Sequence, residues 1–141
     1  MNGQLDLFRG KRQRGRKPPS PTEFQTHCAL ADLIQRRLNP SWKATHLPLG
    51  EHRNLVTAAK LKRMGTRPGY PDFLFTGPNQ SVFWLELKRK GTGRMSPAQC
   101  DVFAHLVTCG FSLLCTDDLD DAVSTLLDLG ILVGLNNKQA V

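Results

Sequence analysis

The sequence predicts an α/β fold in which helices flank a central sheet. Helix signals and strand signals alternate along the chain in the order helix, strand, strand, strand, helix, strand, with a short helix after the first strand and another helix at the end. Two apolar runs separated by a turn sequence predict a hairpin within the sheet. The 141 residues leave room for one hydrophobic core, and no internal repeat divides them.

The chain ends are expected to lie outside this domain. Residues 1–19 are rich in Gly, Pro, Arg, Lys and Gln and carry few apolar side chains, so we interpret them as a flexible basic arm. The domain itself is predicted over residues 20–135, and residues 136–141 form a short tail.

The first helix is predicted to begin at Ser20-Pro21-Thr22-Glu23, because Ser is a favoured cap and Glu three positions later can close a capping box. It should run to about Leu38, before Asn39-Pro40. The apolar positions that we expect it to bury are Phe24, Cys28, Ala31 and Leu38. A strand over residues 42–47 and a Pro-Gly loop follow.

The middle of the chain predicts a short basic helix and then the hairpin. Residues 55–63 read as the helix, ended by Gly65. The strands at 72–76 and 82–88 are joined by Gly77-Pro78-Asn79-Gln80, a turn signal that favours antiparallel pairing.

The last third repeats the helix-start pattern at Ser96-Pro97-Ala98-Gln99. The apolar stripe of that helix, which ends near Gly110, is Val102, Phe103, Leu106 and Val107. A strand over 111–115 follows, and a final helix over 118–129 has aspartates near its positive end and stops at Gly130.

Charge is distributed unevenly and indicates a polyanionic partner. Residues 1–20 contain six Lys or Arg and one Asp, and residues 53–94 contain nine Lys or Arg with only Asp72 and Glu86. Residues 95–141 contain one Lys and six Asp. Basic charge gathered around the acidic pair suits nucleic acid, although a solvated charged face is the simpler meaning of any single charge run.

Several classes of protein do not fit the sequence. No apolar segment is long enough for a signal peptide or a membrane span. The cysteines show no zinc-like spacing and are expected to be reduced core residues of a cytoplasmic protein: Cys28, Cys100, Cys109 and Cys115. His46 and His52 have no cysteine partners at zinc spacing, so a structural role is preferred for both.

Three charged residues stand at the ends of the two hairpin strands. Glu86 and Lys88 are two positions apart in an otherwise apolar strand, so their side chains share a face. Asp72 begins the preceding strand and would meet them if the strands pair. Two carboxylates can bind a hard divalent cation, and a lysine beside them can contact a phosphate or an attacking water.

Pro71-Asp72 and Glu86-Leu87-Lys88 form the residue pattern of the PD-(D/E)XK nuclease superfamily, and the surrounding sequence over residues 21–133 resembles its virus-type replication-repair nuclease (VRR-NUC) family. The resemblance is closest to small stand-alone phage and bacterial members. Its further motifs are Thr22-Glu23, His46-Leu47-Pro48, Gly50-Glu51, Arg53, Leu61-Lys62, Met64-Gly65, Pro68-Gly69 and Ser96-Pro97-Ala98-Gln99. Leu49 departs from the family, where Asn is expected, which puts that loop in doubt and not the metal site.

The resemblance implies a restriction-endonuclease-like core, α-β-β-β-α-β, with a mixed central sheet flanked by helices. It implies that Asp72 and Glu86 bind Mg²⁺ or Mn²⁺ with the Leu87 main-chain carbonyl, that Glu23 reaches the metal directly or through water, and that Gln99 faces the site. Lys88 would position the attacking water in phosphodiester hydrolysis. The resemblance further implies 5′-phosphate products and a homodimer cutting branched DNA such as a Holliday junction.

Simpler roles exist for each of these residues. Glu23 and Gln99 could merely close capping boxes, Asp72 could begin a strand, and Glu86 with Lys88 could be a salt-bridged strand end. His27, one turn after Glu23, could approach the site or be an ordinary helix histidine. The occurrence of Asp72, Glu86 and Lys88 together favours the catalytic interpretation.

The function predicted from these features is a metal-dependent, structure-selective DNA endonuclease acting on branched or flapped intermediates. The basic residues expected to contact DNA are Arg53, Lys60, Lys62, Arg63, Arg67, Arg89, Lys90 and Arg94. The alternatives are a non-catalytic DNA-binding scaffold on the same fold and a sequence-specific restriction-like endonuclease, for which the chain has little room to build a base-reading element.

The arm carries a separate motif. Gln4-Leu5-Asp6-Leu7-Phe8 resembles the peptide by which bacterial replication and repair proteins bind the DNA sliding clamp. Its apolar side chains could dock in a pocket as an extended peptide, or could pack on the domain or across a dimer. The clamp interpretation places the protein in a bacterial cell, encoded by the host or by a phage.

Overall fold

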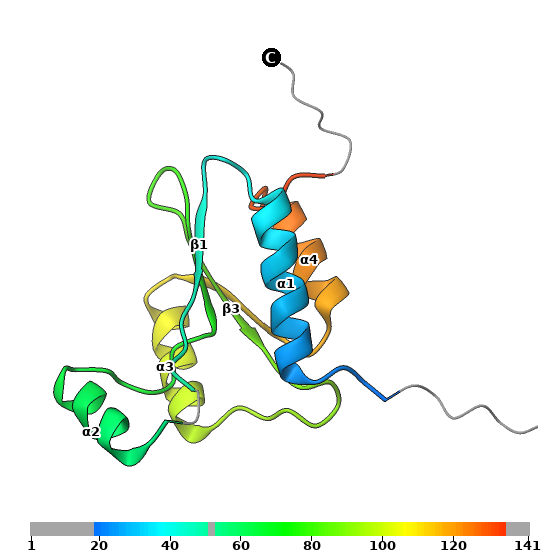
Figure 1. The fold of residues 1–141 in the computed structure, drawn as a ribbon. Helices are drawn as coiled ribbons and strands as arrows, with labels where there is room; N and C mark the ends of the chain where they lie inside the picture. Colours follow the sequence, from blue (N-terminus) through cyan, green and yellow to red (C-terminus); the bar gives the residue numbers. More distant parts are fainter. Residues whose placement is uncertain (1–18, 51–52, 135–141) are drawn as a thin grey trace, which may run out of the picture.

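The computed structural model describes residues 19–50 and 53–134, which form a mixed four-stranded sheet flanked by helices (Figure 1). The element order is the predicted one. The elements are α1 (Glu23–Arg37), β1 (Lys43–His46), α2 (Leu55–Arg63), β2 (Phe73–Thr76), β3 (Val82–Leu87), α3 (Pro97–Thr108), β4 (Ser112–Thr116) and α4 (Leu119–Asp128). None of the helices described is long and apolar enough to cross a membrane.

The sheet has the strand order β1-β2-β3-β4, with the first three strands antiparallel and β4 parallel to β3. The predicted hairpin is confirmed, with Phe73 opposite Leu85. Its turn is closed by the Gly77 N–H, which donates to the Ser81 carbonyl at 2.8 Å. The mixed sheet follows from the connections, because a two-strand hairpin gives antiparallel pairing whereas the β3–β4 connection passes through α3.

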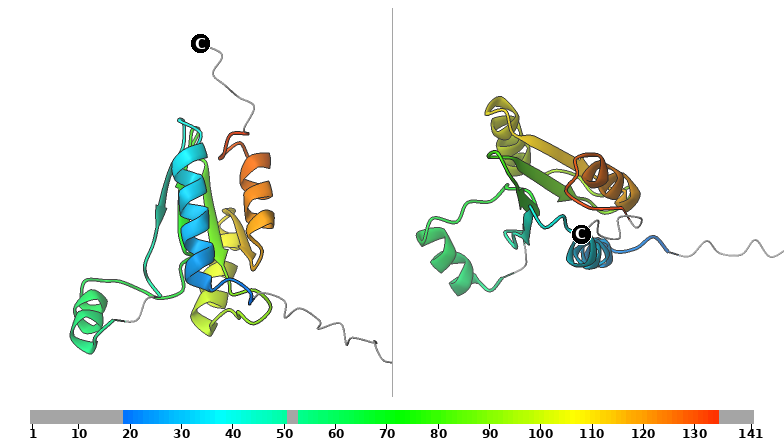
Figure 2. Two further views of the ribbon diagram at one scale, coloured as in Figure 1. Left: turned by 45° about the vertical axis from the view of Figure 1, so that its right-hand side comes forward. Right: turned by 90° about the horizontal axis from the view of Figure 1, so that it is seen from above.

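Alternation along the strands separates the two faces of the sheet. Phe73 and Phe75 of β2 and the odd-numbered residues of β3 pack in one core with α1 and α4. Figure 2 shows α1 and α4 on this side and α3 on the opposite side. Glu86 is an even-numbered residue of β3 and is therefore directed toward α3, away from the apolar core.

The first helix differs from the prediction in its start and in the face that it buries. Its N-cap is Thr22, which forms a capping box with Gln25, so the box expected between Ser20 and Glu23 is wrong. The second residue of a capping box lies three positions after the N-cap. Because the N-cap is Thr22, that residue is Gln25, and Glu23 has no capping role.

The apolar stripe predicted for α1 is also largely wrong. Leu30 and Ile34 are the buried residues, whereas Phe24 is 76% exposed and Cys28 and Ala31 are exposed as well. The helix has two apolar stripes, and only the one that continues through Leu30 and Ile34 meets the sheet. The exposed stripe borders the pocket described below.

Two further predictions about burial need correction. The cysteines are free, as expected, but Cys28, Cys100 and Cys109 are exposed and Cys115 is half-buried, so they are not core residues. Val107 is 61% exposed, while Phe103 and Leu106 carry the buried face of α3. Cys28, Cys100 and Val107 lie on helix faces that do not pack on the sheet, whereas Cys109 is the C-cap of α3 and Cys115 lies in β4.

Helix α2 stands apart from the rest of the domain. It has the predicted bounds, yet none of its residues is buried, and Figure 1 shows it projecting from the body of the fold. Leu55 and Val56 are 88% and 80% exposed. Its basic side chains and these apolar ones are therefore available to a partner.

Candidate active site

Asp72 and Glu86 lie side by side where β2 begins and β3 ends. The Asp72 N–H donates to Glu86 Oε2 at 3.1 Å, and the Leu87 N–H donates to Asp72 Oδ2 at 2.9 Å. The antiparallel register produces this exchange, because Phe73 is paired with Leu85 and the preceding residue therefore lies opposite Glu86. The hairpin thus brings together the two carboxylates that the sequence predicted to meet.

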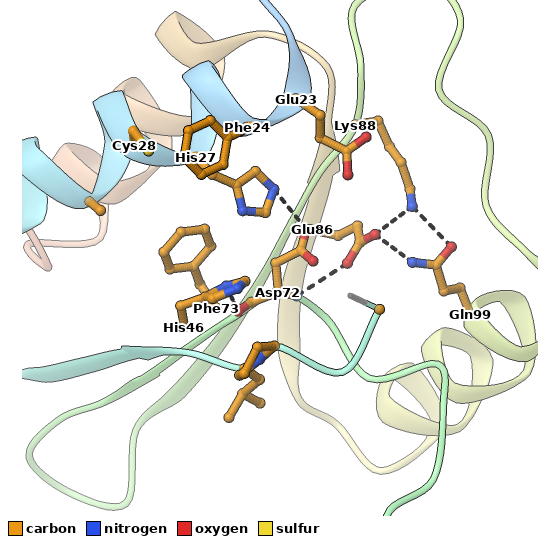
Figure 3. A pocket seen from close by; sticks show the side chains of 14 residues that line it. Glu23, Phe24, His27, Cys28, His46, Asp72, Phe73, Glu86, Lys88 and Gln99 are labelled. Carbon is orange, nitrogen blue, oxygen red and sulfur yellow. Dashed lines mark hydrogen bonds and ion pairs between the residues drawn. The ribbon is translucent and has the colours of Figure 1, made fainter. Parts of the chain in front are cut away.

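Lys88 and Gln99 complete a polar group around Glu86 (Figure 3). Lys88 Nζ forms an ion pair with Glu86 Oε1 and donates to Gln99 Oε1 at 2.9 Å. Gln99 Nε2 donates to the same Glu86 oxygen at 2.5 Å. Glu86 is 1% exposed, so both partners compensate a carboxylate that has almost no access to water.

Gln99 performs two tasks that the sequence presented as alternatives. It closes the capping box of α3, accepting from the Ser96 N–H at 2.9 Å, and the same side chain binds Lys88 and Glu86. The helix start therefore fixes the amide in the orientation that the site uses. The capping role of Gln99, unlike that of Glu23, is confirmed.

The pKa values of the two carboxylates are shifted in opposite directions. Burial raises the pKa of Glu86 to about 7, with repulsion from Asp72 adding to the effect and Lys88 opposing it. Burial also acts to raise the pKa of Asp72, but its contacts with His27 and the Leu87 N–H outweigh burial and leave that pKa lowered. Asp72 is the readily ionised member of the pair.

Two histidines border the carboxylates. His27 Nε2 lies 3.4 Å from Asp72 Oδ2, and burial of His27 is outweighed by Asp72, which raises the pKa of the imidazole. His46 Nδ1 lies 2.9 Å from the Asp72 carbonyl oxygen, and its ring meets His27 edge-on at a centroid distance of 5.4 Å. His27 therefore does approach the site, and His46 supports the main chain beside it.

These residues line a pocket of about 480 Å³. Glu23 lies at its edge with the side chain directed inward, as Figure 3 shows, and Phe24 and Cys28 form part of an apolar wall. The pocket thus has a charged side, formed by the strand ends, and an apolar side, formed by α1 and the loop after β1.

The N-terminal ends of two helices meet this pocket. Glu23 is the first residue of α1, and Gln99 lies in the first turn of α3. Helix N-termini carry partial positive charge and unpaired N–H groups, which favour an anion such as a phosphate. The site therefore places acidic side chains beside two helix N-termini.

The donor set suits a hard divalent cation. Two carboxylates lie side by side, and burial, with repulsion from Asp72 adding to it, raises the pKa of Glu86; a bound dication would favour the charged form of both groups. Over residues 19–50 and 53–134, no three His, Cys, Asp or Glu side chains already form a metal-binding group. Mg²⁺ commonly binds through one or two carboxylates with water completing the shell, so this pair fits such an ion.

The predicted DNA-contacting residues are dispersed around this site. Lys60, Lys62 and Arg63 are exposed on the projecting α2. Lys90 is bound to Asp118 at 3.1 Å, so part of its charge is already compensated. Arg53 contacts the Pro48 carbonyl, and Arg67 lies near the carbonyl oxygens of Lys62 and Thr66. Arg89 and Arg94 are exposed. The clamp-like residues Gln4, Leu5, Asp6, Leu7 and Phe8 lie outside the described residues.

The sequence contained a signal for the position of His27, which was overlooked because Phe24 was expected to be buried. Glu23, His27, Leu30 and Ile34 follow a spacing of four, three and four, which places them on one helix face. The buried part of that face anchors α1 to the sheet, and its polar part therefore reaches the site. The apolar wall at Phe24 was missed because its stripe was assigned to the core.

The fold is an α/β domain in which helices flank a mixed four-stranded sheet. A solved structure titled "VRR_NUC domain protein" is similar to the chain with a TM-score of 0.62 and 22% sequence identity, covering 79% of this chain and 89% of that one. A second, titled "VRR_NUC domain", has a TM-score of 0.52 and 15% identity, covering 77% and 97%. The chain thus has the fold of VRR_NUC domain proteins, which confirms the resemblance expected from the sequence at the level of fold. No protein-family model and no curated protein matches the sequence.

Proposed function

We propose that this protein is a divalent-metal-dependent nuclease that hydrolyses phosphodiester bonds in branched or flapped DNA. The observation that carries the proposal is the almost fully buried Glu86, held beside Asp72 with Lys88 and Gln99 at a pocket on a VRR_NUC fold. A structural ion pair would not need a second carboxylate at the same point. Buried like charges are costly unless a cation binds between them.

In this proposal each residue has a defined task. Asp72 and Glu86 bind Mg²⁺ or Mn²⁺, with the Leu87 carbonyl and Glu23 as further ligands, directly or through water. The ion supplies Lewis-acid polarisation of the phosphate and lowers the pKa of water. Lys88 offsets negative charge that develops on the phosphate, and Gln99 keeps the Lys88 ammonium in place.

The choice of nucleic acid as the substrate class rests on charge. The chain has a formal net charge of +7, and α2 presents basic side chains without an acidic residue in its length. We propose that α2 contacts phosphates at a distance from the reacting group, together with the other basic residues predicted from the sequence.

Cleavage of a four-way junction on two strands requires two sites, and the chain has one, so we propose that it acts as a homodimer. The exposed apolar side chains of α2, among them Leu55 and Val56, support an assembly. Sedimentation or light scattering of the purified protein measures the oligomeric state directly. A monomer at micromolar concentration would contradict the proposed homodimer.

The clamp interaction stays a separate proposal. It rests on Gln4-Leu5-Asp6-Leu7-Phe8 alone. A peptide of residues 1–10 should bind a bacterial sliding clamp at roughly micromolar affinity. Replacing both Leu7 and Phe8 by Ala should abolish clamp binding of the full chain and leave cleavage of free DNA unchanged; clamp binding that survives this change would refute it.

The nuclease proposal is tested with end-labelled flap, splayed and four-way DNA, each with Mg²⁺, Mn²⁺ or EDTA. We expect cleavage that needs the metal and prefers branched over linear duplex DNA. Salt-sensitive binding without cleavage under any metal would favour the DNA-binding scaffold. Cutting of linear duplex at one sequence would favour a restriction-like enzyme.

A further inference from the structure

His27 presents a ring nitrogen to the carboxylate pair. Its Nε2 atom is buried, has no hydrogen-bond partner within the described structure, and lies 3.4 Å from Asp72 Oδ2. A buried polar atom normally makes a hydrogen bond, whereas this nitrogen has only the longer ion-pair contact with Asp72, which needs an explanation.

We propose that His27 Nε2 is a ligand of the divalent ion bound by Asp72 and Glu86, and that this nitrogen makes the site bind Mn²⁺ in preference to Mg²⁺. The inference rests on the metal site of the proposed function. It adds a ligand that a carboxylate-and-lysine motif does not contain.

The spacing of the donor atoms supports a shared ion. Adjacent ligands of one octahedral ion, each about 2.1 Å from the metal, lie about 3 Å apart. The 3.4 Å between His27 Nε2 and Asp72 Oδ2 is close to this value. The Leu87 N–H donates to the same Asp72 oxygen at 2.9 Å, so the Asp72 carboxylate lies between His27 of α1 and the end of β3.

The second histidine is less suited to this role. His46 Nδ1 is directed to the Asp72 carbonyl oxygen, which fixes that ring to the main chain. His27 instead is held by Phe73 at a centroid distance of 5.4 Å, a contact that orients its ring and leaves Nε2 facing the carboxylate. His46 is therefore the matched control.

The nitrogen determines the choice of metal. Mg²⁺ strongly prefers oxygen ligands and keeps its waters, whereas Mn²⁺ and later transition metals accept imidazole readily. A site of carboxylates and one histidine should therefore discriminate between the two ions more strongly than carboxylates alone.

A competing account makes His27 a protonated partner of Asp72 that a metal must displace. Removing the histidine would then leave Mn²⁺ affinity unchanged or would increase it. The proposal predicts the reverse, so the two accounts are separated by a binding measurement that does not depend on activity.

The experiment uses the full chain with less than one equivalent of Mn²⁺. Electron spin-echo modulation of the bound ion should reveal coupling to ¹⁴N in the natural protein, and labelling all histidines with ¹⁵N should replace that coupling by the ¹⁵N pattern. His27→Gln should lose the nitrogen coupling, and His46→Gln should keep it. Mn²⁺ affinity measured by titration should fall about tenfold in His27→Gln, with a smaller loss for Mg²⁺.

Each other outcome contradicts the inference. Mn²⁺ that binds the natural protein without nitrogen coupling would show that histidine is no ligand, while the proposed carboxylate site would stand. Nitrogen coupling that is lost in His46→Gln and kept in His27→Gln would show that His46, and not His27, binds the ion. Absence of any bound Mn²⁺ would overturn this inference and the metal dependence together. Thermal unfolding of both variants shows whether either substitution disturbs the fold. The isotope labelling uses the natural protein, so its result does not depend on a variant that folds correctly.

Discussion

Within residues 19–50 and 53–134, Glu86 is the charged residue that is buried. A carboxylate that is 1% exposed is stabilised by Lys88 and Gln99, yet its pKa still rises to about 7. The site therefore retains a group that the folded chain alone does not favour in its charged form. Such a cost is expected where a cation supplies the missing compensation.

The first prediction concerns stability against pH in EDTA. The raised pKa of Glu86 means that its contribution to stability is present below its ordinary value of 4.5 and is lost as pH rises toward about 7. His27 also has a raised pKa and acts in the same direction, whereas the lowered pKa of Asp72 matters only in more acidic solution. Glu86→Gln should thus match the natural protein near pH 4.5 and exceed its unfolding free energy at pH 8 by on the order of 1–3 kcal/mol.

Denaturant unfolding of both proteins at the two pH values measures this difference. An advantage of Glu86→Gln that is equal at both values would show that ionisation is not its cause. A Glu86→Gln protein less stable at pH 8 would mean that Lys88 and Gln99 compensate the carboxylate fully.

Gln99 permits capping to be separated from site geometry. Gln99→Ala removes the cap bond and both contacts to the site, whereas Ser96→Ala removes only the cap bond from its hydroxyl. Both variants should lose about 1 kcal/mol of stability, but Gln99→Ala alone should reduce cleavage at saturating DNA by tenfold or more. Equal cleavage rates of the two variants would show that Gln99 contributes only to capping of α3 and not to cleavage.

At the scale of elements, the hairpin and α3 are positioned by a glycine. Gly69 has a φ of +104°, and a Cβ there would lie 2.4 Å from the Ala98 carbonyl oxygen at the start of α3. The chain can pass this close to the helix only without a side chain. The segment that leads into Asp72 thereby keeps its place beside α3 and Gln99.

This contact predicts unequal effects of two glycine substitutions. Gly69→Ala combines an unfavourable φ with a backbone clash and should cost more than about 2 kcal/mol of stability. Gly91→Ala is the matched control, because Gly91 also has a positive φ of +72° but has no atom within 4 Å of the added Cβ. Comparable unfolding free energies for the two variants would show that the approach to α3 is not tight.

Helix α2 carries the charge that we assign to DNA binding. Replacing Lys60, Lys62 and Arg63 by Gln should reduce the slope of log affinity against log salt by up to about three units on duplex DNA. The control is Arg36→Gln at the end of α1, a residue outside the proposed contacts. Fluorescence anisotropy at several salt concentrations gives the slopes, and an unchanged slope for the triple variant would place the DNA elsewhere.

At the scale of the whole molecule, alternation and turn chemistry were sufficient to predict the β2–β3 hairpin. Phe83, Leu85 and Leu87 face the core and Glu86 faces away, as a period of two requires, and Gly77-Pro78 closes the expected hairpin. The family resemblance implied a mixed sheet, but the parallel pairing of β3 with β4 is seen only in the structure, since sequence spacing alone does not select a strand partner. The fold was confirmed by comparison with solved structures.

Burial on the helices could not be predicted as well. Helix α1 has two apolar stripes, and only tertiary packing selects Leu30 and Ile34 over Phe24 and Cys28. The same selection brings His27 to Asp72, a contact between residues far apart in the sequence. Site residues on strands were therefore easier to predict than those on helices, because a strand pair fixes the neighbours of each side chain.

The central claim is that Asp72, Glu86 and Lys88 form a metal-dependent phosphodiester-cleaving site. The most direct measurement is the single-turnover rate on a labelled flap substrate with Mn²⁺ for Asp72→Asn, Glu86→Gln and Lys88→Gln, compared with Asp128→Asn, which removes a carboxylate at the end of α4. We predict a rate reduced at least about a hundredfold in the first three, with fold and DNA affinity retained, and an unchanged rate in the control. Near-normal cleavage by any of the three site variants would contradict the claim.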